Sequence, residues 1–217
     1  MTHPDAVLFD CDGTLVDSET VTTAAMRAAL AEQGHELTDE HLAQMVGHPW
    51  PRTRALFAEL YGMDEDDLRA YEARMRSGDG IVLDDPELVF DDVLAVLDDL
   101  AEAQVPVAVV TSSGRSHLDK VLDLAPLRGR FEVRVAREDV EEHKPSPVPY
   151  LSALEQLRAA TGLDLRQVTV VEDSGPGVAA GRAAGCWTVA VDRGDGLHDL
   201  SLADRIVTHL RTADLNP

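Results

Sequence analysis

The sequence predicts an α/β fold, an open parallel β-sheet with helices on both faces, into which a small all-helical domain is inserted. Short apolar runs recur along the 217 residues and alternate with segments of helical periodicity, as expected of a parallel sheet wrapped by helices. The strongest runs end in polar or acidic residues. Residues 18–78, which follow the first run, contain no convincing strand pattern. Together these observations indicate one core domain interrupted by a helical insert.

Continuous apolar runs are typical of parallel strands that are buried on both faces. The strand candidates are residues 6–10, 107–112, 168–173 and 187–192, with weaker ones at 131–136 and 205–208. Apolar residues at helical spacing lie between them. The clearest examples are Val93, Val96, Leu97 and Leu100, and then Leu151, Leu154 and Leu157.

The insert divides into four helical segments separated by Gly and Pro residues. The expected helices are residues 19–33, 39–46, 51–61 and 65–76. We expect the acidic run 64–67 to start the last of them, because acidic side chains favour a helix N-terminus. The predicted division is a core of residues 1–16 and 87–217, with the helical domain at 17–86.

Composition narrows the possible partners. The chain has 19 Lys and Arg against 40 Asp and Glu, a formal net charge of −21. This charge disfavours nucleic acid and anionic membrane surfaces as partners, and an anionic ligand would need local cations or a metal. No apolar run approaches the roughly 20 residues of a membrane helix. The N-terminus lacks a signal-peptide pattern, and two cysteines are too few for a disulfide framework, so we expect a cytoplasmic protein. The sequence does not indicate an oligomeric state.

Acidic residues stand where two of the strong strand candidates end. Asp10 ends the first and Asp12 follows two residues later, and Glu172 and Asp173 close the third. In an open α/β sheet, ligands bind at the carboxyl ends of the strands, so these side chains should converge. Carboxylates bind Mg²⁺ and can attack phosphorus, and a second acid two residues further on can transfer protons.

Hydroxyl and ammonium groups complete this pattern. Thr111 and Ser112 end the second strong strand candidate, and Lys144 precedes a proline in the following loop. Hydroxyls, backbone N–H groups and one lysine can hold the oxygens of a phosphoryl group. Lys144 would also reduce the repulsion among the acids.

In this order, the polar segments resemble the four motifs of the haloacid dehalogenase-like hydrolase superfamily. The segments are Phe9–Ser18, Val109–Ser113, Lys144–Pro145 and Glu172–Gly185. The resemblance implies a Rossmann-like core. The helical insert is similar to the cap of the branch that contains phosphoglycolate phosphatase, small sugar-phosphate phosphatases and β-phosphoglucomutase.

The resemblance implies a role for each matching residue. Asp10 would be the nucleophile and Asp12 the general acid and base. Thr111 would bind the phosphoryl group, with Ser112 as a helper. Lys144 would bind phosphate and brace Asp10.

The resemblance also implies a Mg²⁺ cofactor. Asp173 would bind the ion together with Asp10 and the backbone carbonyl of Asp12. Glu172 would ligate the ion directly or through water.

These roles predict a Mg²⁺-dependent phosphatase that hydrolyses a small phosphorylated metabolite, of the phosphoglycolate or sugar-phosphate type, through an aspartyl-phosphate. The first alternative is a β-phosphoglucomutase-like phosphomutase. Thr22 stands where such mutases carry a His, and Trp50 where they carry an Arg, so hydrolysis is favoured. Dehalogenation is disfavoured because true dehalogenases lack an acid at the position of Asp12.

The alternative from another class is a non-catalytic, receiver-like phosphate-binding module. Such a module would lack both the helical insert and the acid at Asp12.

For a phosphatase, substrate choice would depend on residues of the insert and on one residue after the second motif. These candidates are Thr22, the segment 48–52, Arg54 and Arg115.

Two further features have structural interpretations. Cys11 lies between the two acids, and strand alternation predicts that its thiol points into the interior and is inert. The small residues of 179–185 indicate close helix packing rather than a binding element.

Overall fold

The computed structural model describes residues 3–45, 50–77, 85–194 and 199–217. The chain falls into two compact units, Met1–Ser18 with Leu83–Pro217, and Glu19–Val82. None of the helices in these described ranges combines the length and the apolar character that a membrane span requires.

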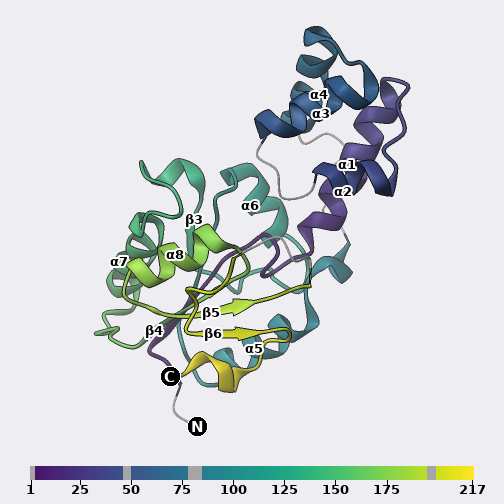
Figure 1. Ribbon diagram of the computed structural model, residues 1–217. Coiled ribbons are helices and arrows are strands. Elements are labelled where there is room, and N and C mark those ends of the chain that lie inside the picture. Colours follow the sequence, from purple (N-terminus) through teal and green to yellow (C-terminus); the bar gives the residue numbers. More distant parts are fainter. Residues whose placement is uncertain (1–2, 46–49, 78–84, 195–198) are drawn as a thin grey trace. The chain divides into compact units, whose positions relative to one another are not determined.

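The first unit is built on a six-stranded sheet in which all pairings are parallel, in the order β3-β2-β1-β4-β5-β6 (Figure 1). The strands are β1 (Ala6–Phe9), β2 (Val107–Val110), β3 (Val133–Val135), β4 (Val168–Glu172), β5 (Trp187–Val191) and β6 (Arg205–Val207). The predicted α/β class is confirmed. Each strand is shorter than its predicted run: the polar residues at the carboxyl ends of five runs fall outside the strands, and β3 also begins two residues later than predicted.

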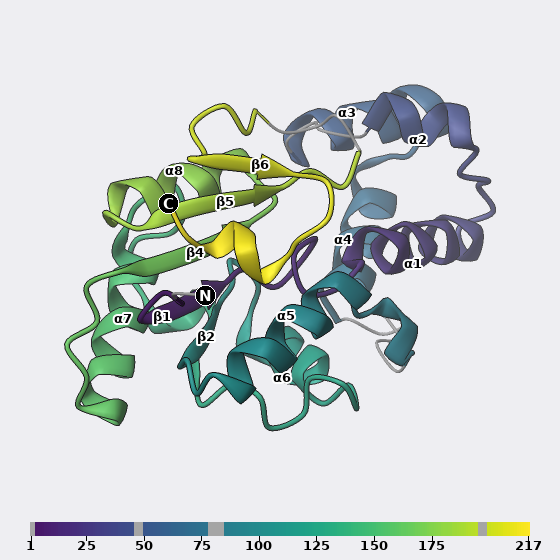
Figure 2. The ribbon, with the colours of Figure 1, turned by 90° about the horizontal axis from the view of Figure 1, so that it is seen from below.

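Helices cover both faces of the sheet (Figure 2). The connecting helices are α5 (Asp91–Glu102), α6 (Arg115–Leu122), α7 (Val148–Thr161) and α8 (Gly175–Ala183), with short 3₁₀ helices at Pro86–Leu88, Arg137–Asp139 and Thr212–Leu215. From β1 to β3 the chain moves towards one edge, and from β3 to β6 it moves back across the sheet towards the other edge. Because such crossovers are right-handed, α5 and α6 lie on one face and α7 and α8 on the other.

The core between the sheet and α7 comes from alternate strand residues and one stripe of the helix. Ala6 and Leu8 of β1 pack there against Tyr150, Leu154 and Leu157 of α7. Leu151 continues the predicted apolar spacing of this helix but is 44% exposed. The buried stripe therefore runs through Tyr150 instead, and an aromatic side chain reaches the carboxyl end of the sheet.

The close packing predicted for the small residues of α8 is confirmed at Gly181. A Cβ atom built at this position would lie 2.9 Å from Thr188 Oγ1 and 3.0 Å from Val170 Cγ1. The helix therefore rests directly on β4 and β5, which fixes the position of its N-terminus near the end of β4.

The described residues of the second unit form four helices around their own core. They are α1 (Ser18–Glu32), α2 (Asp39–Met45), α3 (Trp50–Tyr61) and α4 (Glu65–Ser77). Phe57 and Tyr71 meet edge to face at its centre, with ring centroids 4.8 Å apart. Asp64 Oδ1 accepts hydrogen bonds from the backbone N–H groups of Asp66 and Asp67, which confirms the predicted start of α4.

Substitution of Gly181 by Val should destabilise the core domain by about 1–3 kcal/mol, since the added carbons would overpack a filled interface. Urea unfolding would measure the loss. Ala183→Val adds the same side chain at an exposed position of α8 and should cost less. Equal stability of the two variants would contradict this account of the packing.

Candidate active site

The register of the sheet brings the polar strand ends to one place. Phe9 of β1 pairs with Val109 of β2 on one side and with Val171 of β4 on the other. Asp10 follows directly, and its backbone N–H donates to Val171 O at 2.9 Å. The direction of chain progression reverses between β1 and β4, and this switch point is where open α/β sheets bind ligands.

Three of the predicted acids form a cluster at this point. Carboxylate oxygens of Asp10, Glu172 and Asp173 all lie within 4.8 Å of one another. Glu172 is fully buried and Asp10 is 7% exposed. Thr14 Oγ1 donates to Asp173 Oδ1 at 3.4 Å, so the loop after β1 also reaches the cluster.

Lys144 lies at the centre of the acids. Its Nζ donates to Asp10 Oδ1, to Glu172 Oε1 at 2.7 Å and to the backbone carbonyl of Val110 at 2.9 Å. The ammonium lies 4.9 Å from the ring centroid of Tyr150. The Tyr150 hydroxyl donates to Glu172 Oε1 at 2.7 Å. Sequence reasoning missed Tyr150, because this residue lies in none of the motifs and its spacing fits one more apolar position of α7.

The electrostatics of the cluster follow from burial. Burial raises the pKa of Asp10 well above its usual range, opposed by Lys144 and reinforced by Glu172. Burial alone would raise the pKa of Glu172. The charge of Lys144 and the hydrogen bonds that Glu172 accepts outweigh burial, so the pKa is lowered. Burial and the charge of Glu172 raise the pKa of Asp173 to about 7. The single positive charge of Lys144 therefore does not neutralise three acids, and the cluster has more acidic groups than positive charges.

This charge deficit fits a hard divalent cation, which prefers carboxylate oxygens. The oxygens of Glu172 are already engaged: Oε1 by Lys144 and Tyr150, and Oε2 by the backbone N–H and hydroxyl of Ser174. Asp10 and Asp173 therefore have more free coordination capacity than Glu172 does. In the described part of the chain, these three acids form the group with metal-ligand spacing.

Two glycines permit the close approach of backbone to this cluster. Gly13 has φ +77°, and a Cβ atom there would lie 2.0 Å from Asp173 Oδ2. At Gly177, in the first turn of α8, a Cβ atom would lie 1.7 Å from Glu172 Oε1. Side chains at these positions would displace the acids, so both glycines are required by the site.

Asp12 points towards the second motif. Its Oδ2 accepts from Ser113 Oγ at 2.8 Å and from Thr111 Oγ1 at 3.3 Å, and its Oδ1 lies 2.7 Å from His117 Nε2. Burial acts to raise the pKa of Asp12, but the hydrogen bonds from His117 and Ser113 outweigh it, and the pKa is lowered. Ser112 is exposed. Sequence reasoning singled out Ser112. It missed Ser113, which the loop turns towards Asp12, and His117, which reaches Asp12 from α6.

An arginine braces the loop that carries the first motif. Arg193 donates to the backbone carbonyls of Gly13 and Thr14, and its guanidinium lies 3.7 Å from the ring centroid of Phe90. It also pairs with the buried Asp92 at 2.9 Å. Burial acts to raise the pKa of Asp92, but Arg193 and a backbone hydrogen bond outweigh it and lower the pKa.

Two of the residues suggested for substrate choice have partners within their own units. Arg115 pairs with Asp139, and Arg54 with Glu65 at 2.7 Å. Thr22 is exposed on α1. Residues 48 and 49 lie outside the described residues.

Cys11 is fully buried, as predicted. Burial is the largest cause that raises the pKa of its thiol well above the usual range, and the negative charges of Asp12 and Asp10 raise it further. The thiolate is therefore disfavoured at this position.

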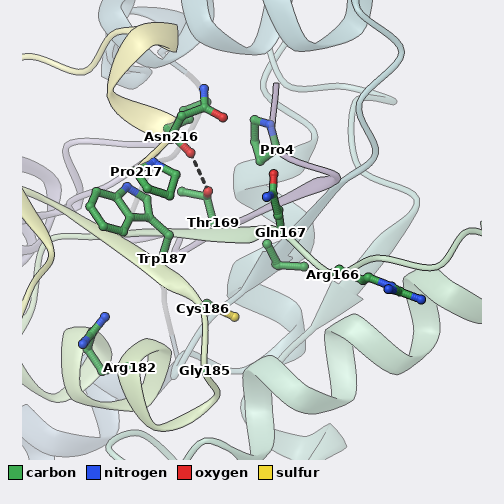
Figure 3. Close-up of a pocket in the computed structure, with 12 residues that line it drawn as sticks. Pro4, Arg166, Gln167, Thr169, Arg182, Gly185, Cys186, Trp187, Asn216 and Pro217 are labelled. Carbon is green, nitrogen blue, oxygen red and sulfur yellow. Dashed lines mark hydrogen bonds between the residues drawn. The ribbon is translucent and has the colours of Figure 1, made fainter. Parts of the chain in front are cut away.

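A cavity of about 450 Å³ lies at the opposite end of the strands, at the starts of β4 and β5 (Figure 3). Its arginines are already paired: Arg166 with Asp164 at 2.6 Å, and Arg182 with Asp204. Thr169 Oγ1 donates to Leu215 O at 2.7 Å along its wall. The cavity is thus separated by the length of the sheet from the acids at the carboxyl ends.

Comparison with known proteins places this geometry in a family. The family model described as haloacid dehalogenase-like hydrolase matches residues 7–191. A phosphoglycolate phosphatase of Xanthomonas campestris pv. campestris is 30% identical over 208 residues, covering 92% of this chain and 88% of the relative. The fructose-1-phosphate phosphatase of Escherichia coli K12 is 29% identical over 186 residues, covering 85% of this chain and 95% of the relative.

A solved structure gives the same assignment. A haloacid dehalogenase family hydrolase of Deinococcus radiodurans R1, with bound phosphate and sodium, superimposes with a TM-score of 0.73 at 28% identity. The alignment covers 99% of this chain and 94% of that one. This chain belongs to the haloacid dehalogenase-like hydrolases. Within that family it is a phosphoric monoester hydrolase, which sets aside the receiver-like alternative.

The Asp92–Arg193 pair makes stability depend on pH. The folded-state pKa of Asp92 is lowered, so its contribution is present above the unfolded-state value of about 3.9 and is lost as pH falls through the folded value. Asp92→Asn should cost roughly 3 kcal/mol at pH 7, and the cost should shrink below about pH 4.

Thermal unfolding of both proteins between neutral and acid pH would measure this difference. Asp91→Asn, at the exposed neighbouring position, provides the control. A cost for Asp92→Asn that stays constant down to the most acidic pH would contradict the linkage.

Proposed function

We propose that this enzyme hydrolyses a small phosphorylated metabolite, of the phosphoglycolate or sugar-phosphate type, through an aspartyl-phosphate on Asp10 and with Mg²⁺ as cofactor. The observation that carries the proposal is the placement of Asp10. Its carboxylate is held by Lys144 beside two further acids, and a second carboxylate, Asp12, stands two residues on against hydroxyl groups.

In the first half of the reaction, a carboxylate oxygen of Asp10 attacks phosphorus while the bond from phosphorus to the ester oxygen breaks. Asp12, in its protonated form, gives its proton to the departing oxygen. The resting carboxylate has a lowered pKa, and the negative charge of an incoming phosphate favours uptake of that proton. Lys144 fixes the orientation of Asp10 and offsets part of the charge.

In the second half, water attacks the phosphorus of the aspartyl-phosphate and the bond to Asp10 breaks. Asp12, now ionised, takes the proton from that water. Inorganic phosphate leaves and Asp10 is a free carboxylate again. Asp12 holds the proton taken from water, which it passes to the next leaving group or releases to solvent. The lowered pKa of Asp12 suits this step, because the base must be unprotonated.

Asp10, Asp173 and the backbone carbonyl of Asp12 would hold Mg²⁺, with Glu172 as a further ligand directly or through water. When bound, the ion would supply positive charge to the acids and to the phosphoryl oxygens. Thr111, Lys144 and the loop at Ser112 would bind those oxygens. The phosphate in the related Deinococcus structure supports an anion site in this fold.

The rest of the substrate must be recognised by groups outside the acid cluster. The names of the relatives support small organic phosphates as the substrate class. Thr22, Arg54 and Arg115 remain candidates for this recognition, together with segment 48–52. Cys11 and Cys186 are free thiols, which supports a reducing, cytoplasmic setting.

The proposal is tested by incubating the purified protein with a panel of phosphorylated metabolites that includes 2-phosphoglycolate and hexose phosphates. We expect inorganic phosphate to be released in step with loss of the ester. Conversion of a hexose 1-phosphate into its 6-phosphate without release would instead establish the phosphomutase alternative.

Asp10→Asn should abolish turnover while the protein stays folded, because the amide keeps the shape of the side chain but is not a nucleophile. Phosphate release and thermal unfolding should be measured together. Asp123→Asn, an exposed change of the same kind, is the control. A folded Asp10→Asn variant with more than about a tenth of the wild-type rate would exclude Asp10 as the nucleophile.

Exhaustive chelation should remove activity, and Mg²⁺ should restore it. Ca²⁺ should restore little, because it accepts more ligands in a looser shell, whereas Mg²⁺ imposes octahedral geometry. The measurement is the rate as each ion is titrated back. An undiminished rate in the chelated protein would rule out the metal assignment.

A further inference from the structure

We infer that His117 is a positioning residue for Asp12, and that it holds the carboxylate in the orientation its proton transfers require. The inference rests on the proposed role of Asp12. His117 Nε2 lies 2.7 Å from Asp12 Oδ1 across 105 residues of sequence. The two side chains are 25% and 28% exposed, so water screens this hydrogen bond only in part.

The carboxylate of Asp12 is fixed at both oxygens. Oδ2 accepts from Ser113 Oγ and Thr111 Oγ1, which both belong to the loop after β2. Hydroxyls rotate about their C–O bonds, and these two donate to the same oxygen. Ser18, at the start of α1, also hydrogen-bonds to Asp12. His117 is the imidazole contact at Oδ1, and a ring held by a helix is placed to set the plane of the carboxylate.

His117 is suited to this task because its backbone is rigid. It lies in the first turn of α6, where its N–H donates to Gly114 O at 3.0 Å. Leu118 and Val121 of the same helix are fully buried and fix α6 on the sheet. The imidazole thus reaches Asp12 from a packed helix, whereas Asp12 itself stands on a loop.

Asp12 has different partners from the other acids. Lys144 pairs with Asp10 and Glu172, while Asp12 is held by the second-motif loop and α6. His117 is therefore placed to affect the two proton transfers of Asp12 without contacting the nucleophile. Proton transfer by a positioned side chain typically contributes about 10²–10⁴-fold, and a misplaced donor loses part of that factor.

The size of this loss depends on the leaving group. Phenoxide needs a proton from Asp12 as it departs, whereas p-nitrophenoxide is stable enough to depart without one. Because phenyl phosphate and p-nitrophenyl phosphate have nearly the same shape, a binding defect would affect both alike. A positioning defect would affect phenyl phosphate more.

The experiment compares kcat/KM for these two esters in the wild type, His117→Ala and His117→Gln. The Ala variant should lose about tenfold or more on phenyl phosphate and less than about threefold on p-nitrophenyl phosphate. The Gln variant, whose amide nitrogen can take the place of Nε2, should recover most of the loss. His117→Leu replaces the Ala variant if the latter does not fold, and Lys120→Ala, exposed on α6, is the control.

Equal losses on both esters, or no loss, would overturn the inference. Asp12→Asn measured in parallel separates this failure from failure of the proposed function. If Asp12→Asn loses activity selectively on phenyl phosphate and the His117 variants do not, only the positioning role is wrong. If Asp12→Asn behaves like the wild type on both esters, the proposed role of Asp12 itself is wrong.

Discussion

A buried ammonium group between two buried carboxylates is the interaction on which the site depends. Lys144 contacts Asp10 and Glu172, and its side chain is 4% exposed. Removing one member of such a group would leave an uncompensated charge in the interior, which costs several kcal/mol. The same contact orients the nucleophile, so the stability of this edge of the sheet and its chemistry are linked. Tyr150 extends the linkage into the core beneath α7.

Much of the fold could be predicted because the sequence pattern is strong where burial is complete. β1 is apolar throughout, β4 is buried throughout, and helices such as α5 keep one apolar stripe. The strands were predicted one or two residues too long at the carboxyl end, because periodicity does not show at which residue a strand such as β1 or β2 ends. The short 3₁₀ helices were missed, since three or four residues are too few to show a period.

The site was predictable where a residue type and its place in a motif agree, as for Asp10 and Asp173, whose assigned roles remain predictions. The site was not predictable where the conformation of a loop decides which side chain faces it. Ser112 and Ser113 are the same residue type, and the turn after β2 alone directs Ser113 to Asp12. His117 gave no sequence indication, because its partner lies in another motif and a single histidine on a helix has many structural explanations.

The site residues at the carboxyl edge of the sheet differ in how they are built into the fold. The residues proposed for chemistry on β1 and β2, Asp10, Asp12 and Thr111, all follow the last paired residue of their strand. Asp12 and Thr111 lie outside the buried group formed by Lys144, Asp10 and Glu172, so a change of their side chains leaves no charge of that group unpaired. Glu172 is different, since it pairs within the sheet with Ala190 and also anchors Lys144. A lineage of such proteins could thus exchange one reaction for another at Asp12 and Thr111, while Glu172 would resist replacement whatever the substrate.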